Sequence, residues 1–389
     1  MWCRRGLAYL PLLTQVPDLS LASIGLNPEP PPIAIIHCEG HFAGLDGKTA
    51  HGLVRHCDAF KIRAVIDSHC AGIDAGTVLD GVANGIPIVA DLEEALGLPG
   101  VRPDTFIYGM APATGLFGEG DRRVLLGAIA AGLNLVSGMR EFLNDDAEFE
   151  AAASRHQVSI RDVRRPAALK DLRMFNGSIV RAQCLRIAVL GTDGAIGKRT
   201  TATLLVRALQ KHGISTALVS TGQTGLIQDG RFGIALDAIP SQFCSGEVEA
   251  AVVQAFDDVR PAVIVIEGQG ALSHPAYLSS SFILRGSQPQ AVILQHAPAR
   301  RNLSDFPFMP MPTPASEIRL IEAFAPTKVI GLTINHEGMD DSELTAAISL
   351  YEAELAIPVT DAVSRPASRL VTMVLRAFPE LNNKLQGEL

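Results

Sequence analysis

Short apolar runs alternate with segments of helical periodicity through the first half of the chain. The runs that predict strands lie at 33–36, 63–67, 86–90, 105–108, 134–137 and 158–163. Helices are predicted at about 49–60, near 78, from 91, and at 121–131 and 142–156. Strands that alternate with helices form a parallel sheet covered on both faces. The pattern therefore predicts a Rossmann-like domain, although the dinucleotide fingerprint GxGxxG is missing.

The alternation continues in the second half of the chain. The runs that predict strands lie at 185–190, 216–220, 262–266, 291–295, 329–334 and 357–360. Helices are predicted after 198, from near 246, after 313, after 340 and from about 366. Two of these helix starts carry capping signals, because Pro314 follows Thr313 and Glu343 stands three residues after Asp340. A second parallel α/β sheet is expected here.

A glycine-rich turn joins the strand at 185–190 to the following helix. It reads GTDGAIGKRTT, and backbone N–H groups of such a turn, the helix N-terminus and a lysine ammonium together bind phosphate. The common P-loop motif has four residues between its glycines and Ser or Thr after Lys; here there are five, and Arg199 follows Lys198. A threonine can hold magnesium from a shifted helix start, or no magnesium lies there. The expected phosphate-binding residues are Gly191, Thr192, Asp193, Gly194, Ala195, Ile196, Gly197, Lys198, Arg199, Thr200 and Thr201.

The segment 164–183 mixes charge with Pro166 and Gly177, so the domain junction is placed there. A chain of 389 residues exceeds what one hydrophobic core usually supports. We expect a leader at 1–32, a Rossmann-like domain at 33–170 and a P-loop NTPase-like domain at 184–389. The predicted fold class is α/β, with the Rossmann-like parallel-sheet domain preceding the P-loop NTPase-like domain.

Composition narrows the class of partner. The chain is 47% hydrophobic and carries a net charge of -8 without a basic run, which argues against nucleic acid. No apolar stretch approaches the length of a membrane span. The six cysteines are scattered without a CxxC pair, so a reducing cytoplasm is the expected location. A nucleotide-sized ligand stays compatible with this charge, because it needs only a local positive loop, and a homo-oligomer is possible.

Polar side chains follow several strands of the predicted second sheet. Ligands bind at the carboxyl edge of open α/β sheets, so these side chains are candidate site residues. Glu267 ends a fully apolar run, where P-loop proteins hold magnesium or a water. Thr200 and Glu267 are therefore the candidate magnesium ligands. The candidate substrate residues are Thr221, Gln223, Thr224, Asp237, Gln269, Ser273, His296 and Arg300, with Arg301 beside the last.

The first domain offers weaker candidates. His37 and His41 are four apart, but a strand end and a glycine separate them, so a zinc pair is not favoured. Four charged residues at predicted strand ends either close over the site or lie in solvated loops: Glu39, Lys48, Asp67 and Asp74.

Two segments of the second domain resemble dethiobiotin synthetase and its cobyrinate-amidating relatives. GTDGAIGK resembles their P-loop, and IEGQG at 266–270 resembles their EGAGG segment. In those enzymes the glutamate helps bind magnesium and an asparagine after a late strand reads adenine. The resemblance implies these roles for Glu267 and Asn335.

A broader resemblance spans nearly the whole chain. HCEGHFAGLDGKTAHGLVRH, AVIDSHCAGIDAG, NGIPIVADLEEAL, NLVSGMREFL, GTDGAIGKRTT, VSTGQTGLIQDG, IEGQGALSHPAY and GSQPQAVILQHAPAR follow in order a bacterial and archaeal two-domain P-loop family. Its characterised members are similar to the DgcN-type D-glutamate N-acetyltransferases of D-amino-acid catabolism. GKxTT is that family's form of the motif, so Arg199 is a regular feature. Gln242 is a departure, because an acidic residue is expected there.

The resemblance implies transfer of an acetyl group from acetyl-CoA to the amine of D-glutamate. The phosphate-binding loop would then hold the 3′-phospho-ADP half of CoA. Such chemistry needs a base and donors for the tetrahedral oxyanion. Glu267 and His274 are the candidate bases, and backbone N–H groups of 268–271 are candidate oxyanion donors.

Two other functions stay open at this point. An ATP-dependent ligase or kinase of the dethiobiotin-synthetase type, acting on a small carboxylate, would place Mg-ATP on Lys198, Thr200 and Glu267. A nucleotide-binding regulator without chemistry of its own is the third. The sequence leaves open whether CoA or ATP occupies the P-loop.

Overall fold

A computed structural model describes residues 30–112, 114–228 and 231–382. The predicted leader lies almost wholly outside these residues. The described residues from Pro32 onward form one compact unit that contains two six-stranded parallel sheets. The predicted class, two successive parallel α/β domains, is therefore confirmed. No helix in the described ranges is long and apolar enough to cross a membrane.

The first sheet has the strand order β3-β2-β1-β4-β5-β6. Its strands are β1 (Ile33–His37), β2 (Lys61–Ile66), β3 (Ile88–Val89), β4 (Thr105–Tyr108), β5 (Asn134–Ser137) and β6 (Ile160–Asp162). Its helices are α1 (Lys48–Arg55), α2 (Ala75–Asp80), α3 (Leu92–Gly97), α4 (Glu119–Ala130) and α5 (Ala147–His156). The order reverses direction between β1 and β4, so the carboxyl ends of these two strands flank a topological switch point.

The second sheet has the order β12-β11-β10-β7-β9-β8. Its strands are β7 (Leu185–Gly191), β8 (Thr216–Val219), β9 (Val263–Glu267), β10 (Ala291–His296), β11 (Lys328–Ile334) and β12 (Val359–Asp361). The helices are α6 (Lys198–Lys211), α7 (Gln223–Gln228), α8 (Ser241–Val259), α9 (Ser279–Ser287), α10 (Pro314–Phe324), α11 (Asp341–Leu355) and α12 (Ser368–Ala377). Because β7 lies between β9 and β10, the P-loop stands at the centre of this sheet.

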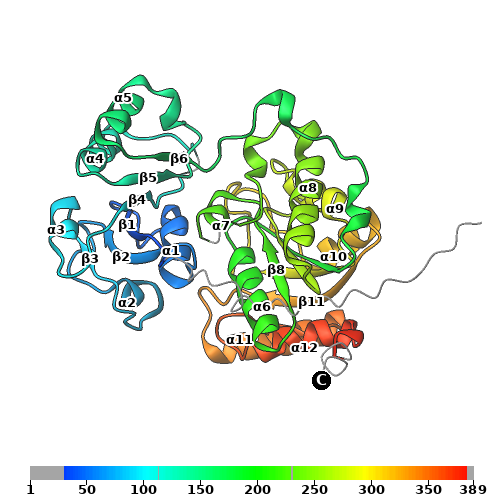
Figure 1. Cartoon of the computed structure of the whole chain (residues 1–389). Coiled ribbons are helices and arrows are strands. Elements are labelled where there is room, and N and C mark those ends of the chain that lie inside the picture. The colour runs from blue at the N-terminus through cyan, green and yellow to red at the C-terminus, as the bar shows by residue number, and fades with distance from the viewer. Residues whose placement is uncertain (1–29, 113, 229–230, 383–389) are drawn as a thin grey trace, which may run out of the picture. The chain divides into compact units, whose positions relative to one another are not determined.

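Strand β7 shows how the second core is built. Its side chains alternate, so Ile187 and Val189 belong to a core shared with α6 and α12. Ala188 and Leu190 belong to a core shared with α8 and α9, on the opposite face. Figure 1 shows α6 and α12 at one side of this sheet and α8 to α10 at the other. A central strand buried on both faces fixes the position of the loop that follows it.

Both predicted capping signals are confirmed. The Thr313 hydroxyl accepts a hydrogen bond from the Ser316 N–H, and Pro314 opens α10. Asp340 and Glu343 form a reciprocal capping box at α11.

Several predicted boundaries were wrong for local reasons. The helix expected at 49–60 ends at Arg55, because the next residues turn away and Asp58 and Ala59 donate to the carbonyl of Gln228. The helix expected at 142–156 is interrupted at Asp146, whose carboxylate caps α5. Helix α9 was not predicted, and α8 begins at Ser241 rather than near Gly246.

Candidate functional site

The P-loop joins β7 to α6 through a backbone that requires glycine. Gly197 has φ of 98°, in the left-handed region that favours glycine. At Gly191 a Cβ would lie 2.9 Å from side-chain atoms of Ile196 and Lys198, so a larger residue would displace the lysine. The Lys198 ammonium donates to the carbonyl oxygen of Asp193 within the loop. The Lys198 side chain is therefore folded back onto its own loop.

Lys198 is almost fully buried, with 6% of its surface exposed. Burial lowers the pKa of its ammonium to about 8, although the charges of Asp193 and Glu267 act in the opposite direction. A bound phosphate would supply the missing negative charge. A bound anion would therefore raise the pKa of the Lys198 ammonium.

The three residues after Lys198 have different surroundings. Thr201 is buried, and its hydroxyl donates to Gln295 Oε1 at 2.6 Å, where Thr333 also donates at 2.5 Å. Thr200 is half-buried. Arg199 turns toward the first domain and donates to Gln228 Oε1. Of the two threonines, Thr201 is held in the core by its hydrogen bond to Gln295. Within the described residues the Thr200 hydroxyl has no such bond.

The Arg199 guanidinium lies against α1. A Cβ built on Gly52 would lie 2.1 Å from Arg199 Nη1 and 2.6 Å from its Cζ. Gln228, which accepts from Arg199, also donates to the His56 carbonyl at the end of α1. The residue directly after the P-loop lysine thus links α6 to the first domain.

Glu267 ends β9 and is buried beside the start of α7. Its Oε2 accepts the Thr221 N–H at 3.1 Å, and Gly225 permits this approach because a Cβ there would lie 2.6 Å from the same oxygen. Burial raises the pKa of Glu267, while the positive charges of Arg199 and Lys198 oppose this. The carboxylate therefore stabilises the turn at 221–222.

These side chains fit a magnesium ion poorly. The position that supplies a hydroxyl ligand in the common motif carries the guanidinium of Arg199, and Glu267 already accepts a backbone N–H. Within the described ranges no group of three or more His, Cys, Asp or Glu side chains can hold a metal ion. Thr200 and Glu267 stay a prediction as magnesium ligands, without further support from this geometry.

His274 has one nitrogen engaged and one unpartnered. Its Nδ1 accepts the N–H groups of Ala276 and Tyr277, both at 3.2 Å. An Nδ1 that accepts places the proton of the neutral ring on Nε2. Nε2 is buried and has no partner among the described residues. Burial lowers the pKa of the imidazole. The ring is thus a neutral N–H donor, which favours oxyanion stabilisation over the predicted role as base.

Asp193, in the P-loop, is fully buried and has one unpartnered oxygen. Its Oδ2 accepts the Ser304 N–H at 2.9 Å and lies 3.4 Å from Arg300 Nη1, but its Oδ1 has no partner in the described part of the chain. Its charge acts on His274 and on Lys198. An unpartnered acceptor, Asp193 Oδ1, and an unpartnered donor, His274 Nε2–H, therefore lie near Lys198 within the described residues.

Arg300 supports the P-loop. Its guanidinium donates to the carbonyls of Gly194 at 3.1 Å and Ala195 at 3.0 Å, and pairs with Glu337. These contacts occupy much of its hydrogen-bonding capacity, so it is placed to hold the loop. A role as a substrate clamp stays untested.

The strand ends next to the P-loop are also tied together. The Thr192 hydroxyl and His296 Nδ1 lie 2.9 Å apart, and burial lowers the pKa of His296 to about 4. The Asn335 N–H donates to the His296 carbonyl, and its side chain approaches Glu337. The Ser273 hydroxyl donates to Glu317 at 2.6 Å. Neutral His296, at the end of β10, supports the P-loop through Thr192.

The segment at 221–225, expected to be a loop, contains the start of α7, which begins at Gln223. Thr224 and Thr49 share a hydrogen bond of 2.9 Å between their hydroxyls. A Cβ on Gly138 would lie 2.9 Å from the Gln223 side chain. The Gln269 amide donates to the Thr221 carbonyl. These contacts join α7 and Thr221 to α1, to Gly138 and to Gln269. The spacing of these residues along the sequence does not reveal the contacts.

Basic residues of the first domain gather around Asp237. Arg140 Nη2 lies 3.2 Å and Arg164 Nη2 3.0 Å from Asp237 Oδ2. Lys48 starts α1, and the charges of Arg164, Asp237 and Asp305 act on its pKa. Sequence reasoning named Lys48 and Asp237 but missed the two arginines, which follow β5 and β6. The position of each arginine shortly after a strand end was the sequence signal that could have identified it.

The other first-domain candidates serve local structure. Asp67 accepts the N–H groups of Gly40, Phe42 and His69, and Asp74 caps α2. Glu39 accepts from Ser68. His37 is buried, with Nε2 3.5 Å from Asp121 Oδ1. Gln242 is exposed in the first turn of α8.

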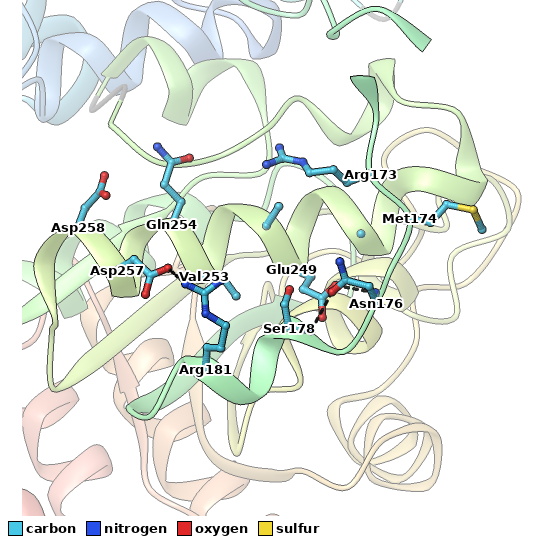
Figure 2. A pocket seen from close by; sticks show the side chains of 12 residues that line it. Arg173, Met174, Asn176, Ser178, Arg181, Glu249, Val253, Gln254, Asp257 and Asp258 are labelled. Atoms are coloured by element: carbon cyan, nitrogen blue, oxygen red, sulfur yellow. Dashed lines mark hydrogen bonds and ion pairs between the residues drawn. The ribbon is translucent and has the colours of Figure 1, made fainter. Parts of the chain in front are cut away.

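A separate groove lies between α8 and the segment that joins the two domains (Figure 2). Glu249 accepts the N–H groups of Asn176 and Ile179, each at 2.9 Å, and Arg181 pairs with Asp257. The predicted site residues do not line this groove. Its polar groups bind one another and fasten the connecting segment to α8.

Comparisons with known proteins identify relatives that match most of the chain. Residues 173–371 match the model described as "Domain of unknown function (DUF1611_C) P-loop domain", and residues 68–166 match the DUF1611_N Rossmann-like domain. A D-glutamate N-acetyltransferase of Tritonibacter scottomollicae is 30% identical over 69% of this chain and 80% of the relative. One of Pseudoalteromonas sp. is 27% identical over 66% and 77%.

A solved structure extends this similarity to three dimensions. The crystal structure of a DUF1611 family protein from Anabaena variabilis ATCC 29413 superposes with a TM-score of 0.82 and 32% sequence identity. The match covers 89% of this chain and 99% of that protein. The family resemblance found in the sequence is confirmed.

Proposed function

We propose, since this chain belongs to the DUF1611 family of two-domain P-loop proteins, that it is an N-acetyltransferase acting on D-glutamate or a similar amino acid. Acetyl-CoA would be the acetyl donor. Two relatives at 27–30% identity carry the name D-glutamate N-acetyltransferase. That similarity supports the reaction class, and the geometry of the P-loop supports the anionic donor.

The observation that carries the proposal is the residue after the P-loop lysine. Hydrolysis or transfer of an ATP phosphate relies on a magnesium ion held by a hydroxyl at that position. Here Arg199 stands there and extends to Gln228 and Gly52. A loop of this kind suits a ligand whose phosphates are bound without being cleaved. The phosphates of acetyl-CoA are such a ligand.

In the proposed reaction, backbone N–H groups of the P-loop and Lys198 bind the CoA phosphates. The neutral amine attacks the thioester carbonyl carbon, forming the C–N bond while the carbonyl electron pair moves to oxygen. His274 Nε2–H donates to this oxyanion. Asp193 Oδ1 takes the amine proton, the C–S bond breaks, and the CoA thiolate receives the proton. The products are the N-acetyl amino acid and free CoA.

This assignment makes a geometric demand on the donor. The long pantetheine arm separates the thioester from the phosphates of CoA, whereas His274 and Asp193 lie close to Lys198. The arm must fold back toward the P-loop for the thioester to reach them. An ATP-dependent ligase or kinase would not need this, because its reacting phosphate lies at the loop itself. Asp193 and His274 lie close to Lys198, and this proximity is the observation that favours an ATP-dependent ligase or kinase.

One assay separates the two functions. The protein is incubated with acetyl-CoA or Mg-ATP and a panel of D- and L-amino acids, while free thiol and phosphate are followed. Thiol release that depends on D-glutamate supports acetyl transfer, and phosphate release without thiol refutes it in favour of the ATP enzyme. Silence in both favours a binding protein. A Lys198→Ala variant with full activity would exclude the P-loop from each reading.

A further inference from the structure

A pair of arginines in the first domain has more hydrogen-bonding capacity than its surroundings use. Arg140 and Arg164 both approach Oδ2 of Asp237, at 3.2 and 3.0 Å. A guanidinium carries five N–H donors in a planar fork. Among the described residues Asp237 is the one hydrogen-bond or ion-pair partner of either guanidinium group, and Arg164 Nε is buried without a partner. Two forks therefore meet a single carboxylate.

The two guanidinium groups share one paired carboxylate. Asp237 faces the positive charges of Arg140 and Arg164, and Lys48 adds a positive charge from α1, on which Asp305 and Asp46 also act. Oδ1 of Asp237 is buried and unpartnered, so both arginines compete for the same oxygen. Burial lowers the pKa of the Arg164 guanidinium, which indicates that its charge is poorly compensated. An anionic ligand would compensate it.

The Arg164 side chain is reachable by a small solute. It lines a cavity of about 360 Å³ between the end of β6 and residues 226 and 233–239, a size typical of small-ligand sites. Arg140 and Asp237 lie outside the lining of this cavity. Arg161 lines the same cavity and has a backbone carbonyl, that of Leu226, as its hydrogen-bond partner at 3.3 Å. Arg165, Arg173, Asp162 and Glu247 also line the cavity, and of its four guanidinium groups Arg161 is the one without an acidic partner in the described ranges.

The cluster is electrostatically connected to the P-loop. The charge of Lys48 helps to lower the pKa of Lys198. The charges of Arg164 and Asp237 in turn act on the pKa of Lys48. Arg140 acts on Tyr277, whose hydroxyl donates to Asp305 at 2.6 Å and whose ring stacks on His274 at 4.4 Å between centroids. The basic cluster and the P-loop therefore border one region of the protein.

We propose that Arg140 and Arg164 bind the carboxylates of a dicarboxylic amino-acid acceptor, with Asp237 orienting the two guanidinium groups. This proposal rests on the proposed acetyl transfer and names the residues that select its acceptor. A carboxylate binds a guanidinium through two parallel N–H···O bonds, so two forks match two carboxylates. An acceptor with an amide in place of the side-chain carboxylate would leave one fork unpaired. Selectivity for D-glutamate over D-glutamine follows.

The test compares Arg140→Gln and Arg164→Gln with wild type, using D-glutamate and D-glutamine as acceptors at saturating acetyl-CoA. Truncating one partner of a buried charged pair weakens binding by roughly 30-fold or more. We expect KM for D-glutamate to rise by at least about 30-fold in one or both variants, while KM for acetyl-CoA is unchanged. The preference for D-glutamate over D-glutamine should shrink by a similar factor.

Two controls separate substrate binding from a structural ion pair. Arg122→Gln removes another arginine of the first domain, which pairs with Asp146 at 2.5 Å and does not line this cavity, and it should leave both KM values unchanged. Arg164→Lys keeps the charge but loses the fork, so it should restore little of the D-glutamate KM. If the Gln variants lower the melting temperature and alter both KM values alike, the arginines are structural and the proposal is wrong.

Calorimetric titration of D-glutamate without acetyl-CoA distinguishes failure of this site from failure of the proposed function. Binding to wild type that is lost in Arg164→Gln, with no acetylation of any acceptor, would retain the carboxylate site and refute the acetyltransferase. Acetylation of D-glutamate with unchanged KM in both Gln variants would retain the function and refute the site. No binding and no acetylation would refute both.

Discussion

Lys198 should couple phosphate binding to proton uptake. Its ammonium has a pKa of about 8 in the free protein because it is buried, and a bound phosphate raises this pKa toward the ordinary value of 10.5 or above. Below pH 8 the lysine is charged before the ligand arrives. Above pH 8 it is neutral and must bind a proton when the ligand binds, so affinity falls as the pH rises through 8.

The size of the effect follows from the two pKa values. At pH 9 about nine in ten free molecules carry neutral Lys198, so binding takes up about 0.9 proton and affinity is about tenfold below its low-pH limit. At pH 7 the uptake is about 0.1 proton. CoA phosphates are fully ionised across the interval from pH 8 to 9, and they contribute little to the change there.

Isothermal titration calorimetry measures this uptake directly. Acetyl-CoA is titrated without an acceptor at pH 7 and 9, each in two buffers with different ionisation enthalpies, and ATP is titrated in parallel. Lys198→Arg keeps its charge at both values, so its uptake should stay near zero. Lys48→Gln removes the neighbouring lysine, whose pKa is also lowered by burial, and should retain most of the wild-type uptake. Equal uptake at pH 7 and 9 in wild type, or the same rise in Lys198→Arg, would refute the reasoning.

Three further predictions concern the surroundings of the P-loop. Gly52→Ala should lower the free energy of unfolding by about 1–3 kcal/mol, because its Cβ would lie 2.1 Å from Arg199 Nη1; Gly127→Ala, where nothing lies within 4 Å, should be neutral or slightly stabilising in the same denaturant titration. EDTA should leave the affinity for acetyl-CoA unchanged in a binding assay, since Arg199 occupies the position of the usual magnesium ligand; a large loss of affinity would restore the metal. His274→Ala should lower kcat about 100-fold or more with little change in KM for the acceptor, and His274→Gln, which keeps an N–H donor, should recover part of it; an unchanged kcat would exclude His274 from the chemistry.

The sequence predicted the parts of this protein that depend on neighbouring residues. Strand β7, the glycine turn and α6 follow one another along the chain, so their apolar run, small residues and helical spacing were visible together. The caps at Thr313 and Asp340 were predicted for the same reason. Local patterns also placed β4 and β5 at their observed bounds.

Partners far apart in the sequence were not predictable from it. Arg199 meets Gln228 and Gly52, and Arg140 and Arg164 meet Asp237, only because strands and helices bring these residues together. Glu267 was visible as a carboxylate at the end of an apolar run, but its hydrogen bond to Thr221 depends on how α7 begins.

By itself, then, the sequence determined the P-loop, the alternation of strands and helices, and the family. These features depend on local backbone preference and on motif spacing, both of which involve residues close together in the sequence. Only the tertiary structure decided what each charged side chain faces. That choice depends on burial and on long-range pairing, since a guanidinium or carboxylate removed from water takes whichever partner the fold places within reach.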